Sequence, residues 1–205
     1  MFKYILIVIA FMALIGGVAS FVHLRRVAAK NHLEMSQFTQ NTTYSNQLGK
    51  VLIMYYSLSG QTEKIARLIA EFTGGTLYKI EPTEVYSSPS VYVKSKKEIE
   101  QKQYPQLSEN LPDFTEYDVI FVGGPVWWYT MATPLFSVLS VADFEGKKVV
   151  PFSTQGSNYG KFFEDFAALA KNADLQIAEN FNNLAPEYDA QVTNKIKVWL
   201  NKIGQ

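Results

Sequence analysis

The stretch that decides the fold reads VLIMYYSLSGQTEKIARLIAE, residues 51–71, which begins as an apolar run and ends as an amphipathic helix. Val51–Tyr56 is continuously apolar, as expected of a strand that is covered on both faces. Ile65, Leu68 and Ile69 then recur with the spacing of one helix face. The turn between them, SLSGQT, carries three hydroxyl groups and one glycine but no charge. This junction predicts a buried parallel strand that leads directly into a helix.

The rest of the chain repeats this alternation of apolar strands and amphipathic helices. Five strands separated by helices predict an α/β fold with right-handed crossovers, in which a doubly wound five-stranded parallel sheet is covered on both faces. Sheets of this kind bind ligands beyond the carboxyl ends of their strands. The further expected strands are Thr76–Ile80, Asp118–Val122, Lys148–Ser153 and Leu175–Glu179, and the further expected helices lie near 93–103, 131–140, 160–171 and 192–203.

The residue types that the chain lacks exclude several chemistries. It contains no cysteine, which excludes disulfides, thiolate nucleophiles, cysteine-bound zinc and iron–sulfur clusters. Its two histidines, His23 and His32, precede the expected domain, which excludes a Ser-His triad or a histidine-bound metal within it. We therefore expect no catalytic side chain and no metal ligand there, and a bound cofactor that supplies the chemistry.

The zero net charge of the chain conceals a difference between its two parts. Of the 19 basic and 19 acidic residues, four basic residues and one acidic residue lie before Leu48, which leaves 15 basic and 18 acidic residues for the remainder. The expected domain is thus mildly acidic and has no basic stripe, so nucleic acid is not an expected partner.

The first 50 residues predict a membrane-associated segment. Tyr4–Leu24 contains no charged residue and, at about 1.5 Å per residue, is long enough to cross a bilayer core of about 30 Å. Arg25, Arg26 and Lys30 follow it, a pattern that keeps the domain in the cytoplasm. The expected organisation is a transmembrane anchor over 1–26, a polar solvated tether over 27–47 and a domain over 48–205.

Two other interpretations of the first segment stay open. As a cleaved secretory signal it would begin with Lys3 and end at small residues near 17–20, and the domain would be secreted or at the cell surface. As a soluble helix it would be buried in the core.

Three loops follow the carboxyl ends of the expected strands, and the first of them suits a phosphate. Its backbone N–H groups and the positive end of the helix dipole favour an anion. Gly60 allows close approach of the backbone, and Ser57, Ser59 and Thr62 offer hydroxyl donors. The lysine of the nucleotide-triphosphate loop is absent, so a terminal monophosphate is expected. The alternative interpretation is that these hydroxyls only cap the helix.

The second and third loops suit a flat heterocycle. GGPVWWYT, residues 123–130, contains three adjacent aromatic residues that offer a stacking surface, although Trp127 or Trp128 alone could instead plug the edge of the sheet. STQGSNYG, residues 153–160, combines small residues, backbone donors and a tyrosine, although it could be an ordinary glycine-rich turn. A phosphate at one end and a planar ring at the other predict flavin mononucleotide (FMN).

Taken together, the three loops resemble those of the flavodoxin-like family. SLSGQT is similar to the family's hydroxyl-rich phosphate loop, GGPVWW resembles its aromatic second loop, and STQGSNYG resembles its third. The resemblance covers about Lys50 to the C-terminus and implies a five-stranded sheet in the order 2-1-3-4-5. It implies that the phosphate is bound by Ser57, Ser59, Gly60, Gln61 and Thr62, that one side of the isoalloxazine ring is flanked by Pro125, Trp127, Trp128 and Tyr129, and that the other side is flanked by Thr154, Gln155, Gly156 and Tyr159.

Several functions are compatible with this site. The first is a carrier that shuttles electrons between partner proteins at a membrane, and the alternative is an NAD(P)H- or quinol-dependent reductase of a small quinone-like acceptor. A phosphoacceptor receiver is disfavoured because the first and third strands end without an acidic pocket. A domain that kept the fold without the flavin is a further alternative. The long connection between Glu81 and Asp113 is expected to lie over the flavin or receive a partner, with Tyr86 and Tyr92 as candidates to reach the site.

Overall fold

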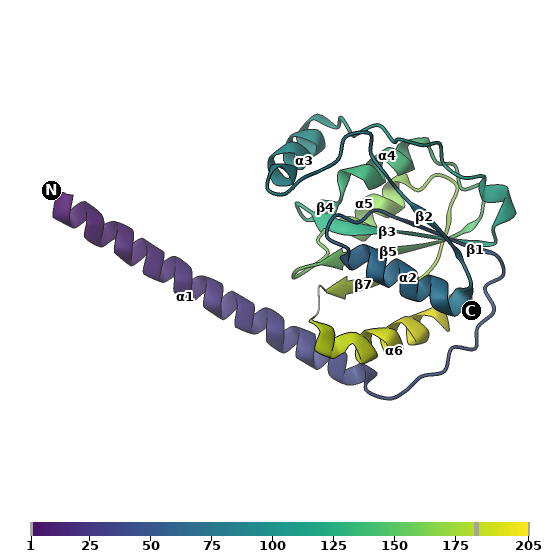
Figure 1. Ribbon diagram of the computed structural model, residues 1–205, viewed down its shortest axis with the longest axis horizontal. Coiled ribbons are helices and arrows are strands. Elements are labelled where there is room, and N and C mark those ends of the chain that lie inside the picture. Colours follow the sequence, from purple (N-terminus) through teal and green to yellow (C-terminus); the bar gives the residue numbers. More distant parts are fainter. Residues whose placement is uncertain (1, 183–184, 205) are drawn as a thin grey trace.

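Parallel strands form the centre of the computed structural model of this chain, which describes residues 2–182 and 185–204. The sheet has the order β2-β1-β3-β5-β6, so the predicted 2-1-3-4-5 order is confirmed, with two short additions (Figure 1). One addition is β4, which pairs antiparallel with β3, and the other is β7, which pairs parallel with β5. The strands are β1 (Val51–Tyr55), β2 (Thr76–Lys79), β3 (Val119–Trp127), β4 (Thr130–Met131), β5 (Lys148–Gln155), β6 (Asp174–Leu175) and β7 (Glu179–Asn182).

The two central strands are longer than the sequence predicts. The Gly-Gly pair that follows Val122 was expected in a loop, but β3 continues through it to Trp127 because it pairs with β5 as far as Pro125. A Cβ atom on Gly123 would lie 2.2 Å from the ring of Phe152, so the glycine serves close packing inside the sheet. β5 likewise extends beyond the predicted end at Ser153.

The expected fifth strand, Leu175–Glu179, is replaced by two shorter segments at its ends. β6 pairs with the beginning of β5 and β7 with its end. Between them the carbonyl of Ile177 accepts a hydrogen bond of 2.8 Å from Trp199 Nε1, and therefore does not serve the sheet.

Helices cover both faces of the sheet, as the fold requires (Figure 1). Ile53 and Phe121 pack into a core with α2, α6 and the end of α1, whereas Leu52, Met54 and Ile120 face the other core with α4 and α5. The helices are α1 (Phe2–Met35), α2 (Gln61–Thr73), α3 (Ser90–Gln101), α4 (Thr133–Val141), α5 (Phe162–Leu169) and α6 (Asp189–Leu200), with short 3-10 turns at Ser36–Phe38, Phe114–Glu116 and Pro186–Tyr188.

The N-terminal helix is longer than expected and docks on the domain. α1 continues to Met35, which is buried, so 27–35 is helix and not the expected tether. Residues 39–47 have no regular structure but pack along the end of α6, where the Asn46 side chain donates to the carbonyls of Leu200 and Ile203 at 2.9 and 2.8 Å. The expected solvated tether is therefore replaced by a fixed connection, because its amide side chains satisfy the carbonyls at the end of α6.

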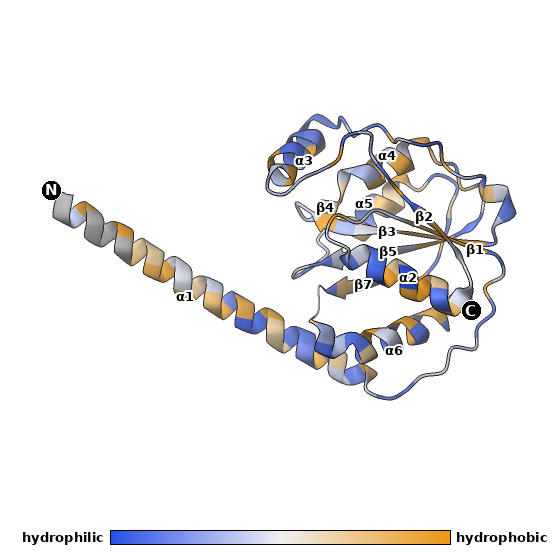
Figure 2. Ribbon diagram, viewed as in Figure 1, coloured by the Kyte–Doolittle hydropathy of each residue, from blue (hydrophilic) through white to orange (hydrophobic). Residues whose placement is uncertain are grey.

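One segment, Phe11–Phe38, which comprises most of α1 and the 3-10 turn after it, is long and apolar enough to cross a membrane. Figure 2 shows that its projecting part is largely apolar and that polar residues gather where it approaches α6. By length and composition this segment fits a membrane anchor or a signal sequence.

Candidate functional site

The three candidate loops lie beside one another at the carboxyl edge of the sheet. β1, β3 and β5 are adjacent and in register, with Tyr55 opposite Gly123 and Gly123 opposite Phe152. Since all three strands run in one direction, the residues that follow them meet at one edge.

The first loop leads into a helix whose N-cap residue, Gly60, has no side chain to cap it. Gly60 stands immediately before α2 in a left-handed conformation with φ of 86°, and a Cβ atom there would meet no atom within 4 Å. The Ser57 hydroxyl accepts the N–H of Glu63 at 3.3 Å, so it serves the first turn of the helix. Within the described part of the chain, no hydrogen bond to protein is donated by the backbone N–H groups of residues 58–62. This group of amides is an anion-binding geometry.

The hydroxyl of Thr62 joins the first loop to the end of β5. Thr62 is buried, and its Oγ1 lies 2.7 Å from Oγ1 of Thr154, which is also buried. Thr154 and Gln155 belong to the strand and not to the following loop, which corrects their predicted position. Ser59, Gly60 and Gln61 are exposed at the tip.

The second loop is a tight hairpin in which two aromatic residues take left-handed conformations. Trp127 pairs with Thr130 across it, while Trp128 and Tyr129 have φ of 52° and 62°. Positive φ at both central residues is the type I′ turn, which normally selects Asn and Gly. An aromatic residue in this region costs roughly 1–2 kcal/mol, and such strain is often found at functional sites.

The two tryptophans of this hairpin have different environments. Trp127 is buried against the rings of Tyr56 and Tyr86, with centroid distances of 5.5 and 5.1 Å, so it fills the edge of the sheet. Burial also raises the pKa of the Tyr56 phenol. Trp128 is 44% exposed, and Tyr129 is exposed as well. Of the three aromatic residues, Trp128 and Tyr129 therefore provide the accessible stacking surface.

The long connection supports the hairpin through α3. Trp128 Nε1 donates to the carbonyl of Tyr92 and to Ser95 Oγ, both at 3.1 Å. The Tyr92 ring meets the Trp128 ring edge-on at 6.3 Å, and Lys96 Nζ lies 5.5 Å from the centroid of that ring. The candidate residue Tyr92 thus reaches the hairpin, as expected.

A partly buried network behind the hairpin was not predicted. Tyr86 Oη and Thr133 Oγ1 each donate to Glu98 Oε2 at 2.7 Å. Burial, and then the bond to Glu98, raises the pKa of the Tyr86 phenol. Glu98 lies on α3 among other charged residues, and no local pattern distinguishes it from a solvated residue.

The third loop is held against the second by backbone contacts. The N–H of Lys161 donates to the Tyr129 carbonyl at 2.7 Å, and a Cβ atom on Gly160 would lie 2.1 Å from that oxygen. Glycine is therefore required at 160. Tyr159 is exposed and its ring lies 5.1 Å from that of Phe163.

The remaining predicted residues occupy both sides of this edge. Pro125 is half-buried in β3, opposite Thr154, and Gly156 is exposed after β5. The Gln155 side chain is buried, and its Nε2 donates to Asn180 Oδ1 at 2.8 Å. The structure therefore brings all predicted residues to one edge, with Ser57, Ser59, Gly60, Gln61 and Thr62 on the first loop, Trp127, Trp128 and Tyr129 in the hairpin, and Thr154, Gln155, Gly156 and Tyr159 along the third segment.

The charges near the site are mostly paired. On α2, Lys64 Nζ lies 2.5 Å from Asp189 and Arg67 lies 2.6 Å from Glu63. Among the described residues, no group of three or more histidine, aspartate and glutamate side chains is arranged to hold a metal ion. The first loop thus presents neutral donors to an anion.

Comparisons with known proteins identify the family of the chain and similar solved structures. The profile of the family described as flavodoxin matches residues 50–203. A protein from Bacteroides uniformis ATCC 8492, provisionally named a flavoprotein, is 29% identical with a TM-score of 0.63, over 75% of this chain and 99% of its own. A similarly named protein from Bacteroides eggerthii DSM 20697 is 26% identical with a TM-score of 0.65, over 77% of this chain and 99% of its own.

A flavoprotein from Lactobacillus acidophilus NCFM, whose structure is a complex with FMN, is 27% identical with a TM-score of 0.58. The match covers 65% of this chain and 93% of that protein. No curated protein matches the sequence.

Proposed function

The chain belongs to the flavodoxin family, and on that premise we propose that it binds FMN at the carboxyl edge of its sheet and carries electrons between partners at a membrane. The observation that carries this proposal is the first loop, where amide groups without a protein acceptor surround the start of α2. The FMN complex of the Lactobacillus acidophilus relative supports the choice of cofactor.

The residues of the first loop fit the phosphate of FMN. A terminal phosphate needs several hydrogen-bond donors, and the amides of residues 58–62 together with the hydroxyls of Ser59 and Thr62 would supply them. Gly60 leaves open space where any side chain would begin. The nearby Lys64 and Arg67 are paired with acids, so the binding would depend on the helix dipole and neutral donors.

The aromatic hairpin and the third loop fit the flat ring. Trp128 and Tyr129 present exposed aromatic faces, and the bonds from Trp128 to α3 hold its indole in place. The third loop approaches the hairpin through the contact of Gly160 with the Tyr129 backbone. These residues would orient the ring and exclude water from its face, while Trp127 forms the buried base of the hairpin.

Bound FMN would supply one- or two-electron transfer, and the protein would supply position and environment. The predicted site residues include no histidine, aspartate, glutamate or lysine that could serve a proton-transfer step. A carrier needs no such group. The alternative, an NAD(P)H- or quinol-dependent quinone reductase, shares the fold and the cofactor.

α1 would anchor this carrier in a membrane, with the domain in the cytoplasm. The supporting features are the uncharged run Tyr4–Leu24 and the basic residues Arg25, Arg26 and Lys30, which follow it on the side that leads to the domain. A cleaved signal, with the domain outside the cell, is the alternative location.

Titration of the purified apoprotein with FMN tests the proposal. We expect the flavin fluorescence to be quenched and its visible spectrum to shift on binding. A folded apoprotein that leaves both unchanged would contradict the proposal. NAD(P)H-dependent quinone reduction well above that of free FMN would replace the carrier by the reductase.

A further inference from the structure

The end of α1 is held on the domain by a buried ionic contact. The Lys195 side chain is 4% exposed, and its Nζ lies 2.6 Å from Glu34 on α1 and 3.1 Å from Glu179 on β7. It also donates to the Asn180 carbonyl at 2.6 Å. Met35 is buried in the adjacent core. The direction of α1 relative to the sheet is therefore determined by packing and not by a loose linker.

This contact joins α1 to the carboxyl edge of the sheet. Asn182, the last residue of β7, donates to Asn31 Oδ1 on α1 at 2.8 Å. Asn182 lies opposite Gln155, the last residue of β5. The contact with α1 therefore lies at the carboxyl edge of the sheet, where the candidate loops begin. Leu24, the end of the uncharged run, precedes Asn31 by seven residues, or about 10 Å of helix. That length is close to the thickness of one headgroup layer, roughly 5–8 Å.

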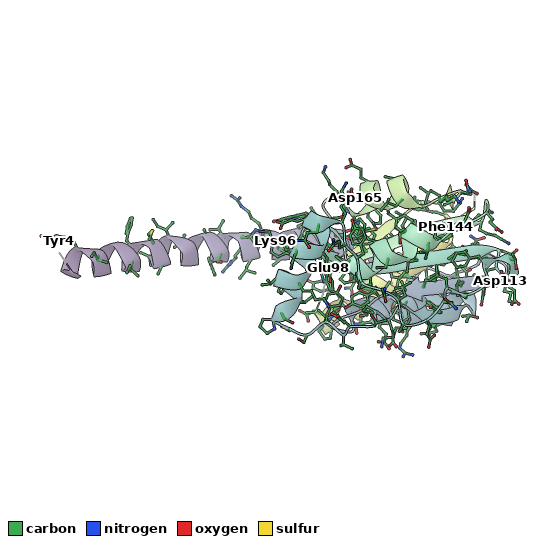
Figure 3. All side chains as sticks on the ribbon, turned by 90° about the horizontal axis from the view of Figure 1, so that it is seen from above. Tyr4, Lys96, Glu98, Asp113, Phe144 and Asp165 are labelled. Atoms are coloured by element: carbon green, nitrogen blue, oxygen red, sulfur yellow. The ribbon has the colours of Figure 1, made fainter. Side chains whose placement is uncertain are left out.

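The candidate site and the apolar part of α1 lie on the same side of the domain. In Figure 1 the strands point toward the side from which α1 projects, and α3 and β4 lie at that end. Figure 3, seen from a perpendicular direction, places Lys96 and Glu98 of α3 at the end of the domain nearest the projecting helix. The two views agree that this edge faces along α1 toward its N-terminus.

The side chains at this edge have the composition of a membrane interface. Tyr92, Val93, Trp128 and Tyr129 are all exposed, and we call them the edge patch. Tyrosine and tryptophan favour the headgroup region because their rings are apolar and their tips are polar. Lys96 and Lys97, also exposed, lie on the same helix and would favour anionic headgroups.

We propose that the edge patch contacts the headgroup region of the bilayer that α1 spans. The inference rests on the proposed membrane location of this flavoprotein and specifies the surface that it uses. The site then opens toward the membrane surface, where it meets a redox partner that is itself held in the membrane. The alternative is that a water-soluble protein binds the edge patch.

Two exposed valines allow a matched test in the full chain, which has no native cysteine. Val93 is 77% exposed in the edge patch, and Val141 is 69% exposed at the end of α4, which lies toward the opposite edge of the sheet. Each would be replaced separately, Val93→Cys and Val141→Cys, and labelled with a nitroxide. The labelled proteins would be reconstituted in nanodiscs of phosphatidylcholine and phosphatidylglycerol.

Collision rates of the nitroxide with oxygen, which concentrates in lipid, and with a water-soluble nickel chelate measure its position. We expect the oxygen-to-nickel ratio at 93 to exceed that at 141 by about threefold or more. Equal ratios in protein that resists alkaline extraction would overturn the inference and favour an aqueous partner. Extraction of the protein by alkali would overturn the membrane location itself. The readout needs no FMN, so a failure of FMN binding is recorded separately, by absorbance.

Discussion

Replacement of Lys195 by methionine tests whether the N-terminal helix is part of the folded domain. The change keeps most of the apolar stem and removes the ammonium that contacts Glu34, Glu179 and the Asn180 carbonyl. Two carboxylates then face each other without the cation. Because one of them lies on α1, the variant weakens both the core around β7 and the attachment of the helix.

The burial of the contact determines the size of the expected effect. Removal of one partner from a buried ion pair costs about 3–5 kcal/mol, because the remaining charge loses its compensation. The side chains of Glu34 and Glu179 are each 23% exposed, so water partly replaces the lost ammonium. We therefore expect the free energy of unfolding to fall by about 3 kcal/mol, at the lower end of that range.

Urea unfolding of the full chain in detergent micelles, followed by tryptophan fluorescence, measures this effect. Trp199 is buried among Phe121, Phe152 and Phe181 and reports on the core beside β7. The matched control is Lys50→Met, which breaks an ion pair with Glu116 whose two side chains are 55% and 60% exposed. That variant should unfold at nearly the same urea concentration as the wild type, because water screens an exposed ion pair. If the two variants unfold at the same urea concentration, α1 does not depend on this contact and the reasoning is refuted.

Three further predictions concern the sheet, the site and a surface carboxylate. Gly123→Ala should lower the free energy of unfolding by about 1–3 kcal/mol, because the new Cβ atom would meet the Phe152 ring at 2.2 Å, and a variant as stable as the wild type in urea would contradict this packing. Thr62→Val removes a buried hydroxyl from the first loop and should raise the Kd for FMN about tenfold in a fluorescence titration, whereas Thr62→Ser should keep the Kd of the wild type. An equal loss of FMN affinity in both variants would show that the methyl group of Thr62, and not its hydroxyl, is needed. Hydrogen bonding, first to Lys171, lowers the pKa of Asp143 from its ordinary 3.8 to about 2. The ionised carboxylate therefore stabilises the fold at a pH above 3.8, and this stabilisation is lost as the pH falls through about 2. The free energy of unfolding should decline less steeply over this pH range in Asp143→Asn than in the wild type, and an unchanged pH profile would refute the assignment.

The sequence by itself determined the fold class and the place of the site. The uninterrupted apolar run of Val51–Tyr56 needs cover on both faces, and the helices that alternate with the strands provide it in a parallel sheet. The hydroxyl-rich turn that follows then has to stand at the carboxyl edge beside the other two loops. These conclusions depend on the spacing of apolar residues and on the residues that directly follow each strand, both of which can be read from short stretches of the sequence.

Other features became visible only in the tertiary structure. Gly123 and Gly124 resembled a loop, but close packing against Phe152 and Leu135 makes them strand residues. The difference between the buried Trp127 and the exposed Trp128 depends on Tyr86 and on α3. Such contacts join residues far apart in the chain.

The position of the N-terminal helix illustrates the same limit. Asn31 and Glu34 read as members of a polar tether, because nothing near them in the sequence shows a partner. Their partners, Asn182 and Lys195, lie about 150 and 160 residues later along the chain. The local pattern of apolar residues determines which helices and strands form, whereas hydrogen bonds and ion pairs between distant polar groups determine the direction of α1 relative to the site. A buried charge such as that of Lys195 is unfavourable without an oppositely charged partner, and the tertiary structure determines which distant residue becomes that partner.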